Sequence, residues 1–301
     1  MRIGVAATPD VAIPTLNWLL HSEHTLELVI TQPDKPAGRG RVLTQSVVGD
    51  WAQAHGIELF KPNSPDDLIG RIEELDLILT IGFGVLLPEH ILKLPKHGFL
   101  NLHFSLLPAY RGAAPAQRAL QNGEAKTGVT VFQLDKGMDT GPIYTQSEIE
   151  IQPAWRSVEL LHELATIGPI TVSDALSQVQ QGKAPTVQTG TSSIAPKISK
   201  AEAKIDFAKP AKEIVNCIRA FTYEPGAWTT WKNEPFKITA AQTFPNHELA
   251  VGSLAIIDSS VQVGTVDGAI ELLSVIPAGK KEMTAAEWAR GARISGGELL
   301  G

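Results

Sequence analysis

The segment Leu100–Pro108 places three polar side chains at alternate positions within an apolar run: Asn101, His103 and Ser105. Alternate side chains of a β-strand share one face, so an amide, an imidazole and a hydroxyl would lie together. Such groups can transfer protons and donate hydrogen bonds to a developing oxyanion. Because α/β folds bind ligands where strands end, the run predicts a ligand site. A solvated edge strand is the alternative interpretation.

A second segment, Leu134–Pro142, is a glycine-punctuated loop that carries the carboxylates of Asp135 and Asp139 directly after an expected strand. Glycines let a backbone approach a ligand closely. A carboxylate beside an imidazole orients it and favours its protonated form, as acid/base catalysis requires. The alternative is a polar turn in which aspartate acts only as a turn former.

Other common sites are not predicted. The first expected strand is followed by Ala6–Asp10 and not by G-x-G-x-x-G, so a nicotinamide or flavin dinucleotide is not expected. The sequence contains no P-loop. His162 and Glu163 begin a zinc-protease motif, but Thr166 stands where the second histidine belongs, and we expect no metal.

The elements that must position these residues alternate between strands and helices in the first part of the chain. This order predicts an α/β fold with a Rossmann-like, doubly wound, mostly parallel sheet. The expected strands are Arg2–Ala7, Leu26–Thr31, Leu75–Gly82, Phe99–Phe104, Gly128–Leu134 and Ile143–Ile151. The expected helices are Ala12–His21, Val47–His55, Pro65–Glu74 and Ser157–Gly182.

The second part of the chain has a different pattern. A stretch rich in proline, glycine, serine and threonine, Lys183–Ser199, fits neither a helix nor a buried strand and reads as a linker. One amphipathic helix, Ala211–Phe221, precedes five short apolar runs, which predict a small β-barrel. These runs are Ala227–Trp231, Phe236–Phe244, Ser253–Ile257, Val261–Val266 and Ala269–Ile276. We therefore divide the chain into domains at 1–183 and 206–301, joined by a linker at 184–205.

The composition is that of a globular protein, with 43% apolar and 19% charged residues and a net charge of −6. Residues 1–190 hold 14 Lys and Arg against 20 Asp and Glu, and residues 191–301 hold 12 of each. A uniformly basic nucleic-acid binder is excluded, whereas contact through local basic patches is not. The chain has a single cysteine, Cys217, which predicts a cytoplasmic protein. Pro9 and Asp10 interrupt the N-terminal apolar run, so no signal peptide or membrane span is expected there.

The order and spacing of several motifs resemble the formyltransferases that use 10-formyltetrahydrofolate, and the resemblance extends over essentially the whole chain. The motifs are Ala7-Thr8-Pro9-Asp10, Asp34-Lys35-Pro36-Ala37-Gly38-Arg39-Gly40-Arg41, Gly82-Phe83-Gly84-Val85-Leu86-Leu87-Pro88, Asn101-x-His103-x-Ser105-Leu106-Leu107-Pro108, Arg111-Gly112-Ala113-Ala114-Pro115, Asp139-Thr140-Gly141, Ile218-Arg219-Ala220-Phe221 and Pro225-Gly226-Ala227-Trp228. The basic insertion Lys35–Arg41 and the second domain favour the branch that formylates methionyl-initiator-tRNA.

The resemblance implies a role for each matching position. The catalytic residues would be Asn101, His103 and Asp139. The folate-binding residues would be Ser105, Leu106, Leu107 and Pro108 together with Phe83, Val85 and Leu86. The tRNA-binding residues would be Lys35, Arg39 and Arg41. The second domain is implied to be an OB-like, tRNA-binding barrel, for which Lys197, Lys200 and Lys204 are generic candidates.

The implied reaction transfers a formyl group from the co-substrate 10-formyltetrahydrofolate to the α-amino group of methionyl-initiator-tRNA, as translation initiation requires. No metal, nicotinamide or membrane partner is expected, and we expect a monomer. One alternative is a formyltransferase that acts on another amine, such as an amino-sugar nucleotide or glycinamide ribonucleotide. Another is a folate-binding or tRNA-binding module without catalysis.

Overall fold

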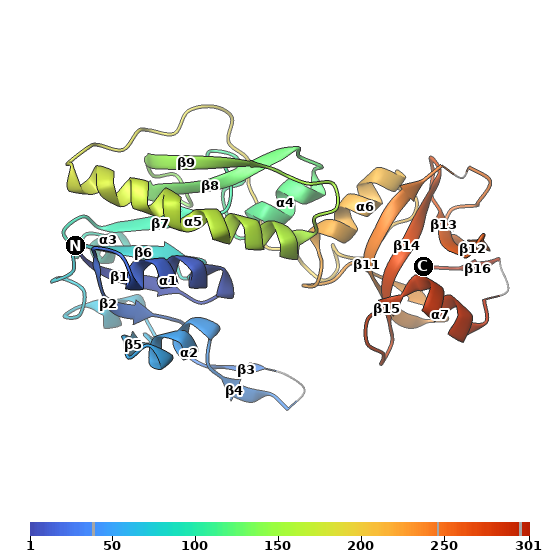
Figure 1. Cartoon of the computed structure of the whole chain (residues 1–301), viewed down its shortest axis with the longest axis horizontal. Coiled ribbons are helices and arrows are strands. Elements are labelled where there is room, and N and C mark those ends of the chain that lie inside the picture. The colour runs from blue at the N-terminus through green and yellow to red at the C-terminus, as the bar shows by residue number, and fades with distance from the viewer. Residues whose placement is uncertain (38–39, 246, 295–296) are drawn as a thin grey trace. The chain divides into compact units, whose positions relative to one another are not determined.

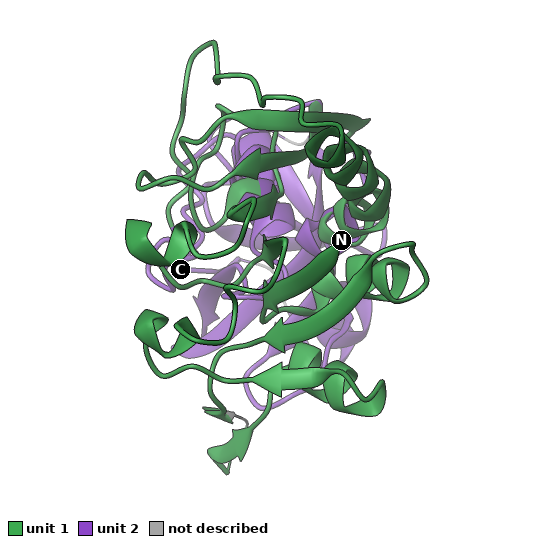
Figure 2. Cartoon of the chain, turned by 90° about the vertical axis from the view of Figure 1, so that its left-hand side faces the viewer, with its two compact units in different colours: residues 1–115, 126–150, 161–196 green, residues 116–125, 151–160, 197–301 purple. Residues whose placement is uncertain are grey.

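The computed structural model describes residues 1–37, 40–245, 247–294 and 297–301. The chain forms two compact units, which Figure 2 distinguishes by colour. Unit 1 comprises residues 1–115, 126–150 and 161–196, and unit 2 comprises residues 116–125, 151–160 and 197–301. In the described part of the chain, no helix is long and apolar enough to cross a membrane.

A seven-stranded mixed sheet forms the centre of unit 1, in the order β5-β2-β1-β6-β7-β8-β9 (Figure 1). Its strands are β1 (Arg2–Ala7), β2 (Thr25–Ile30), β5 (Glu58–Phe60), β6 (Leu77–Ile81), β7 (Phe99–His103), β8 (Lys126–Gln133) and β9 (Ile143–Glu150). The first five strands run parallel, whereas β8 and β9 join antiparallel to their neighbours. The expected α/β fold with a mostly parallel sheet is confirmed.

Among the described residues, four helices pack beside this sheet, three of them where the apolar spacing predicts a helix and one, α3, where no helix was expected. They are α1 (Ile13–Leu20), α2 (Val47–Ala54), α3 (Glu89–Leu92) and α5 (Ser157–Gln180). The hydroxyl of Ser46 caps α2 by accepting a hydrogen bond from Gly49 N at 3.0 Å. In α5, a Cβ at Gly168 would lie 2.9 Å from the Leu102 side chain, so the glycine lets this helix pack tightly on β7.

The expected helix Pro65–Glu74 is wrong beyond its first turn. Only Pro65–Leu68 is helical, as a 3₁₀ turn, after which Ile69 is extended. Gly70 then adopts a φ of +81°, a backbone conformation that ends a right-handed helix. The apolar residues of this stretch still pack inward, because Leu68 and Ile72 are fully buried.

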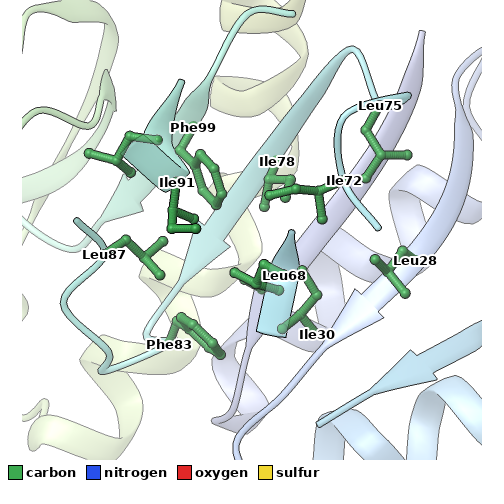
Figure 3. Close-up of a cluster of buried hydrophobic side chains, with 12 residues drawn as sticks. Leu28, Ile30, Leu68, Ile72, Leu75, Ile78, Phe83, Leu87, Ile91 and Phe99 are labelled. Carbon is green, nitrogen blue, oxygen red and sulfur yellow. The ribbon is translucent and has the colours of Figure 1, made fainter. Parts of the chain in front are cut away.

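A buried hydrophobic cluster connects this region to the loops that follow β6 and precede β7 (Figure 3). Leu68, Ile72, Ile78 and Phe99 lie in it beside Phe83 and Leu87, which belong to the segment after β6. Tight packing of these side chains fixes the backbone that carries them. The core therefore positions the segment 82–87.

The basic insertion contains a two-stranded hairpin that local composition does not predict. Strand β3 (Lys35–Ala37) pairs antiparallel with β4 (Val42–Thr44), and the ribbon stands apart from the main sheet (Figure 1). Val42 and Leu43 are exposed, so the hairpin has no core of its own. Arg39 lies outside the described residues.

Unit 2 is built around an antiparallel sheet in the order β10-β11-β14-β13-β12-β16, with β15 beside β14. Its strands are β10 (Trp228–Trp231), β11 (Glu234–Phe244), β12 (Ser253–Ile257), β13 (Ser260–Gly264), β14 (Ala269–Pro277), β15 (Met283–Thr284) and β16 (Glu298–Leu299). An additional bridge between Trp231 and Leu300 nearly closes the sheet, which confirms the small barrel. Three helices accompany it: α4 (Pro115–Gln121), α6 (Ala211–Ala220) and α7 (Ala285–Ala292).

Candidate active site

A cleft of about 410 Å³ opens in unit 1 at the ends of β6 and β7. Four segments contribute to its lining: residues 82–87 after β6, residues 101–104 at the end of β7, residues within 112–115, and residues within 134–139 after β8. Its volume lies within the range of small-molecule binding sites, about 300–1,000 Å³. The two polar segments singled out in the sequence thus meet at one cleft.

Strand β7 is an interior strand, because it pairs with β6 on one side and with β8 on the other. The alternative of a solvated edge strand is therefore wrong. Asn101 and His103 both line the cleft, and His103 is only 6% exposed. Among the described residues, no protein group hydrogen-bonds the carboxamide of Asn101, so its N–H groups are available to a ligand.

Two contacts determine the proton positions on His103. Its Nε2 atom lies 2.9 Å from the carbonyl oxygen of Tyr110. A carbonyl only accepts, so Nε2 carries the hydrogen and donates it. In the neutral imidazole, Nδ1 is therefore unprotonated, and it lies 3.7 Å from Oδ2 of Asp139. A proton that this ring accepts goes to Nδ1, next to a carboxylate.

Burial lowers the pKa of His103 below its ordinary value, because the charged ring loses solvation. The charge of Asp139 and the Tyr110 carbonyl oppose this effect by raising the pKa, but burial is the largest contribution. The balance of these contributions favours the neutral ring. Asp139 does favour the protonated ring, as the sequence predicted for a neighbouring carboxylate, but burial outweighs it, and the geometry favours a neutral base.

Asp139 is held next to His103 by backbone groups. Its Oδ2 atom accepts a hydrogen bond from Gly112 N at 2.7 Å, and its backbone adopts a left-handed φ of +53°. Asp135 plays a local role, since its carboxylate accepts hydrogen bonds from Gly137 N and from the Thr140 hydroxyl. Asp135 therefore stabilises the turn, whereas Asp139 lies next to the imidazole.

The residues that the resemblance implies for folate fall into two groups. Phe83, Val85 and Leu86 line the cleft, and Leu86 is 80% exposed. The second group, Ser105–Pro108, does not contribute to the cleft lining. Its hydroxyl, that of Ser105, donates to Ala109 O at 2.7 Å.

The turn 105–108 is instead held by hydrogen bonds to side chains of β8 and β9. Thr130 of β8 donates its hydroxyl hydrogen to Ser105 O at 2.6 Å and accepts from Leu107 N at 3.1 Å. Gln146 of β9 donates to Leu107 O at 2.9 Å. These contacts hold the turn that leads to Tyr110, whose carbonyl orients His103.

Sequence reasoning missed Tyr110 and Gln188. The Gln188 carboxamide donates to Asp139 O at 2.9 Å and to Gly141 O at 2.8 Å, and it accepts from the Arg111 guanidinium. Gln188 lies in the polar stretch interpreted as a linker, where local composition carries no signal for such a contact. Residues 186–195 in fact hydrogen-bond to Ile143 and Arg111 of unit 1. The domain boundaries at 183 and 205 stay a prediction.

Of the three residues implied for tRNA in unit 1, the structure describes Lys35 and Arg41, and neither lines the cleft. Lys35 lies on β3, and its ammonium group donates to Oε1 of Gln32. Arg41 is exposed and has a left-handed φ of +48° just before β4. In unit 2, the ammonium groups of Lys200 and Lys204 lie 6.0 and 5.8 Å from the centre of the Trp228 ring.

Comparison with known proteins defines the class to which this fold and cleft belong. The family model described as formyl transferase matches residues 1–176, and the model of the formyl transferase C-terminal domain matches residues 197–293. The chain belongs to the formyl transferase family. Two similar proteins, from Salinispora tropica and Streptomyces coelicolor, are 42% and 41% identical over 310 and 309 residues, with each chain covered completely. Both are named methionyl-tRNA formyltransferase.

Solved structures of lower identity share the fold. HypX from Aquifex aeolicus in complex with tetrahydrofolic acid is 19% identical with a TM-score of 0.65, over 96% of this chain and 46% of HypX. The chain thus spans about half the length of HypX. An N-formyltransferase from Helicobacter canadensis, in complex with folinic acid and dTDP-3-aminofucose, is 19% identical with a TM-score of 0.68, over 90% of this chain and 98% of that one. Methionyl-tRNA formyltransferase from Clostridium thermocellum is 18% identical with a TM-score of 0.56, over 81% and 94%.

Proposed function

We propose that this protein transfers the formyl group of 10-formyltetrahydrofolate to the α-amino group of methionyl-initiator-tRNA. The observation that carries the proposal is the meeting of Asn101, His103 and Asp139 at one cleft, with a neutral imidazole beside a carboxylate. Relatives of 41–42% identity over their full length, all named methionyl-tRNA formyltransferase, support this acceptor.

The chemistry requires a base, an oxyanion donor and a charge that stabilises the protonated base. The amine attacks the formyl carbon, and Nδ1 of His103 takes the proton that the amine loses as the new C–N bond forms. Asp139 stabilises the resulting imidazolium. The free carboxamide of Asn101 donates to the oxygen that becomes negative in the tetrahedral intermediate. When the bond from the formyl carbon to the folate nitrogen breaks, His103 returns the proton to that nitrogen.

The cleft supports a folate donor. Phe83, Val85 and Leu86 offer apolar surface to a flat ring, and Gly82 and Gly84 have φ values of +56° and +69° in the same segment. Backbone groups beside such glycines are accessible to the polar edge of a ligand. The tetrahydrofolic acid complex of HypX, whose fold is similar, is consistent with this donor.

A tRNA acceptor needs positive charge at its contact surface. Lys35 on β3 and Arg41 just before β4 are both exposed, and we propose Arg39 as a third contact on the basis of the sequence. Unit 2 adds Lys200 and Lys204, whose ammonium groups both lie near the Trp228 ring. Lysine and tryptophan side chains together suit the phosphates and unpaired bases of RNA.

Formylation of an amino-sugar nucleotide is the competing function, because structures with a similar fold include sugar N-formyltransferases. These are 19% and 21% identical to the chain, about half the value of the relatives from Salinispora tropica and Streptomyces coelicolor. At that distance the likeness supports the fold and not the acceptor.

An acceptor competition tests the proposal. The purified protein is incubated with 10-formyltetrahydrofolate, methionyl-initiator-tRNA and a dTDP-amino-sugar, and the products are separated by mass spectrometry. We expect N-formylmethionyl-tRNA and an unmodified sugar. Formylation of the sugar alone would favour the competing function. Folate binding without either product would indicate that the protein is a binding module without catalytic activity.

A further inference from the structure

We infer that Gln188 is a positioning residue for the reaction: it holds Asp139 at the distance from His103 at which its carboxylate controls the imidazole. This inference rests on the proposed function. Gln188 does not line the cleft, so its action is exerted through the loop that carries Asp139.

The Gln188 carboxamide uses its full hydrogen-bonding capacity within unit 1. Its Nε2 group donates to Asp139 O at 2.9 Å and to Gly141 O at 2.8 Å, on either side of Thr140. Its Oε1 atom accepts from Nη2 of Arg111 at 2.5 Å and from Nε at 3.2 Å. A single side chain therefore joins the Asp139 loop to residue 111.

This link closes a ring of contacts around Asp139. Gly112, the neighbour of Arg111, donates its N–H to the Asp139 carboxylate at 2.7 Å. Asp139 is thus joined to the same backbone segment twice, through its side chain to Gly112 and through its carbonyl and Gln188 to Arg111. The Arg111 backbone is itself held by Ser193 O and Ala195 N. The segment at residues 111 and 112, to which Asp139 is joined, is therefore itself held in place.

Asp139 needs this support because its backbone is strained and its contact with the ring is loose. A φ of +53° is uncommon for a residue other than glycine. Its carboxylate lies 3.7 Å from Nδ1, so no hydrogen bond to the neutral imidazole holds it there. Loss of the Gln188 donors releases the carbonyls at 139 and 141, and the carboxylate can then move away from His103.

The inference predicts a specific kinetic signature. A carboxylate farther from Nδ1 raises the pKa of His103 less. Since the effect of burial is unchanged, the net pKa of His103 falls. The acidic limb of the kcat profile then moves to lower pH, because the neutral ring is the active form. We expect kcat to fall about 10–100-fold, as for loss of a group that orients a catalytic side chain, with KM for both substrates changed less than about threefold.

Three variants separate this role from general stabilisation. Gln188→Ala removes all the bonds. Gln188→Met keeps the length of the side chain without its N–H donors and adds no charge, so it should lose as much activity as Gln188→Ala. Gln178→Ala is the matched control, because Gln178 in α5 also donates to a backbone carbonyl, that of Tyr144, outside the cleft lining.

The experiment measures formyl transfer to methionyl-initiator-tRNA from pH 5 to 9 for the wild type and the three variants, with folding checked by circular dichroism. Titration of the His103 ring by NMR gives its pKa without reference to activity, and Gln188→Met replaces Gln188→Ala should the latter unfold. A lower kcat and a lower His103 pKa in the Gln188 variants, with Gln178→Ala like the wild type, would support the inference. A Gln188 variant with the kcat and pH limb of the control would overturn it. An inactive wild type would instead overturn the proposed function.

Discussion

The Nδ1 atom of His103 lies 3.7 Å from Oδ2 of Asp139, while Nε2 of the same ring is committed to the carbonyl of Tyr110. The arrangement leaves one nitrogen able to accept a proton and places a negative charge beside it. Burial favours the unprotonated form of that nitrogen by lowering the pKa of the ring. A buried base next to a carboxylate suits attack by an amine, which must lose a proton as it is acylated.

Replacing Asp139 by asparagine tests this electrostatic relationship. The substitution keeps the shape of the side chain but removes the charge that raises the pKa of His103, so the pKa falls further. We expect the acidic limb of the kcat profile to move to lower pH and kcat to fall about 10²-fold, since imidazolium is no longer stabilised. An unaltered pH profile and rate would make Asp139 a turn residue only.

Asn101 provides a second, independent test. Asn101 lines the cleft, and its carboxamide has no protein partner in the described structure. Its N–H groups can therefore donate to an oxyanion that forms during the reaction. Asn101→Ala should lower kcat about 10²–10³-fold, the range for removal of one oxyanion donor, with KM little changed. Steady-state kinetics checks this. A loss confined to KM would reassign Asn101 to substrate positioning.

The hairpin is expected to act in tRNA use and not in folate binding. Arg41→Gln removes one exposed charge just before β4, so the slope of log(kcat/KM) for tRNA against log[salt] should decrease by about one unit. Lys93→Ala is a suitable control, because Lys93 is an exposed lysine of the same unit that pairs with Glu89. Equal salt slopes in both variants and the wild type would remove Arg41 from tRNA contact.

A stability prediction concerns the cap of α2. Ser46→Ala removes the acceptor for Gly49 N and the hydroxyl partner of Thr31. The free energy of unfolding should fall by about 1 kcal/mol, as for other lost N-caps. Denaturant unfolding measures this, with Ser46→Asp, which retains an acceptor, as the control. A loss equally large in Ser46→Asp would show that the cap is not the cause.

The sequence predicted those parts of the site that depend on local periodicity. The alternation of Asn101 and His103 with apolar neighbours predicted a strand, found at Phe99–His103, because a period of two matches the alternation of strand side chains. The run Pro65–Glu74 misled because its apolar residues are buried without a helix. The spacing of apolar residues therefore predicts which side chains are buried better than it predicts the conformation of the backbone.

The residues that support the site could not be predicted, because their partners are distant in sequence. Gln188 contacts a loop almost 50 positions away, and Tyr110 acts through a backbone carbonyl that any residue type would supply. The expected folate role of Ser105–Pro108 stays a prediction, since the turn lies outside the cleft lining and is held by Thr130 and Gln146.

The measurement that tests the central claim most directly is a single-turnover assay with isotope-labelled 10-formyltetrahydrofolate and methionyl-initiator-tRNA, comparing the wild type with His103→Ala. We predict labelled N-formylmethionyl-tRNA from the wild type and a rate lower by about 10²–10⁴-fold in the folded variant, the range for loss of a positioned base. Absence of labelled product from the wild type, or a variant rate within about threefold of it, would contradict the account.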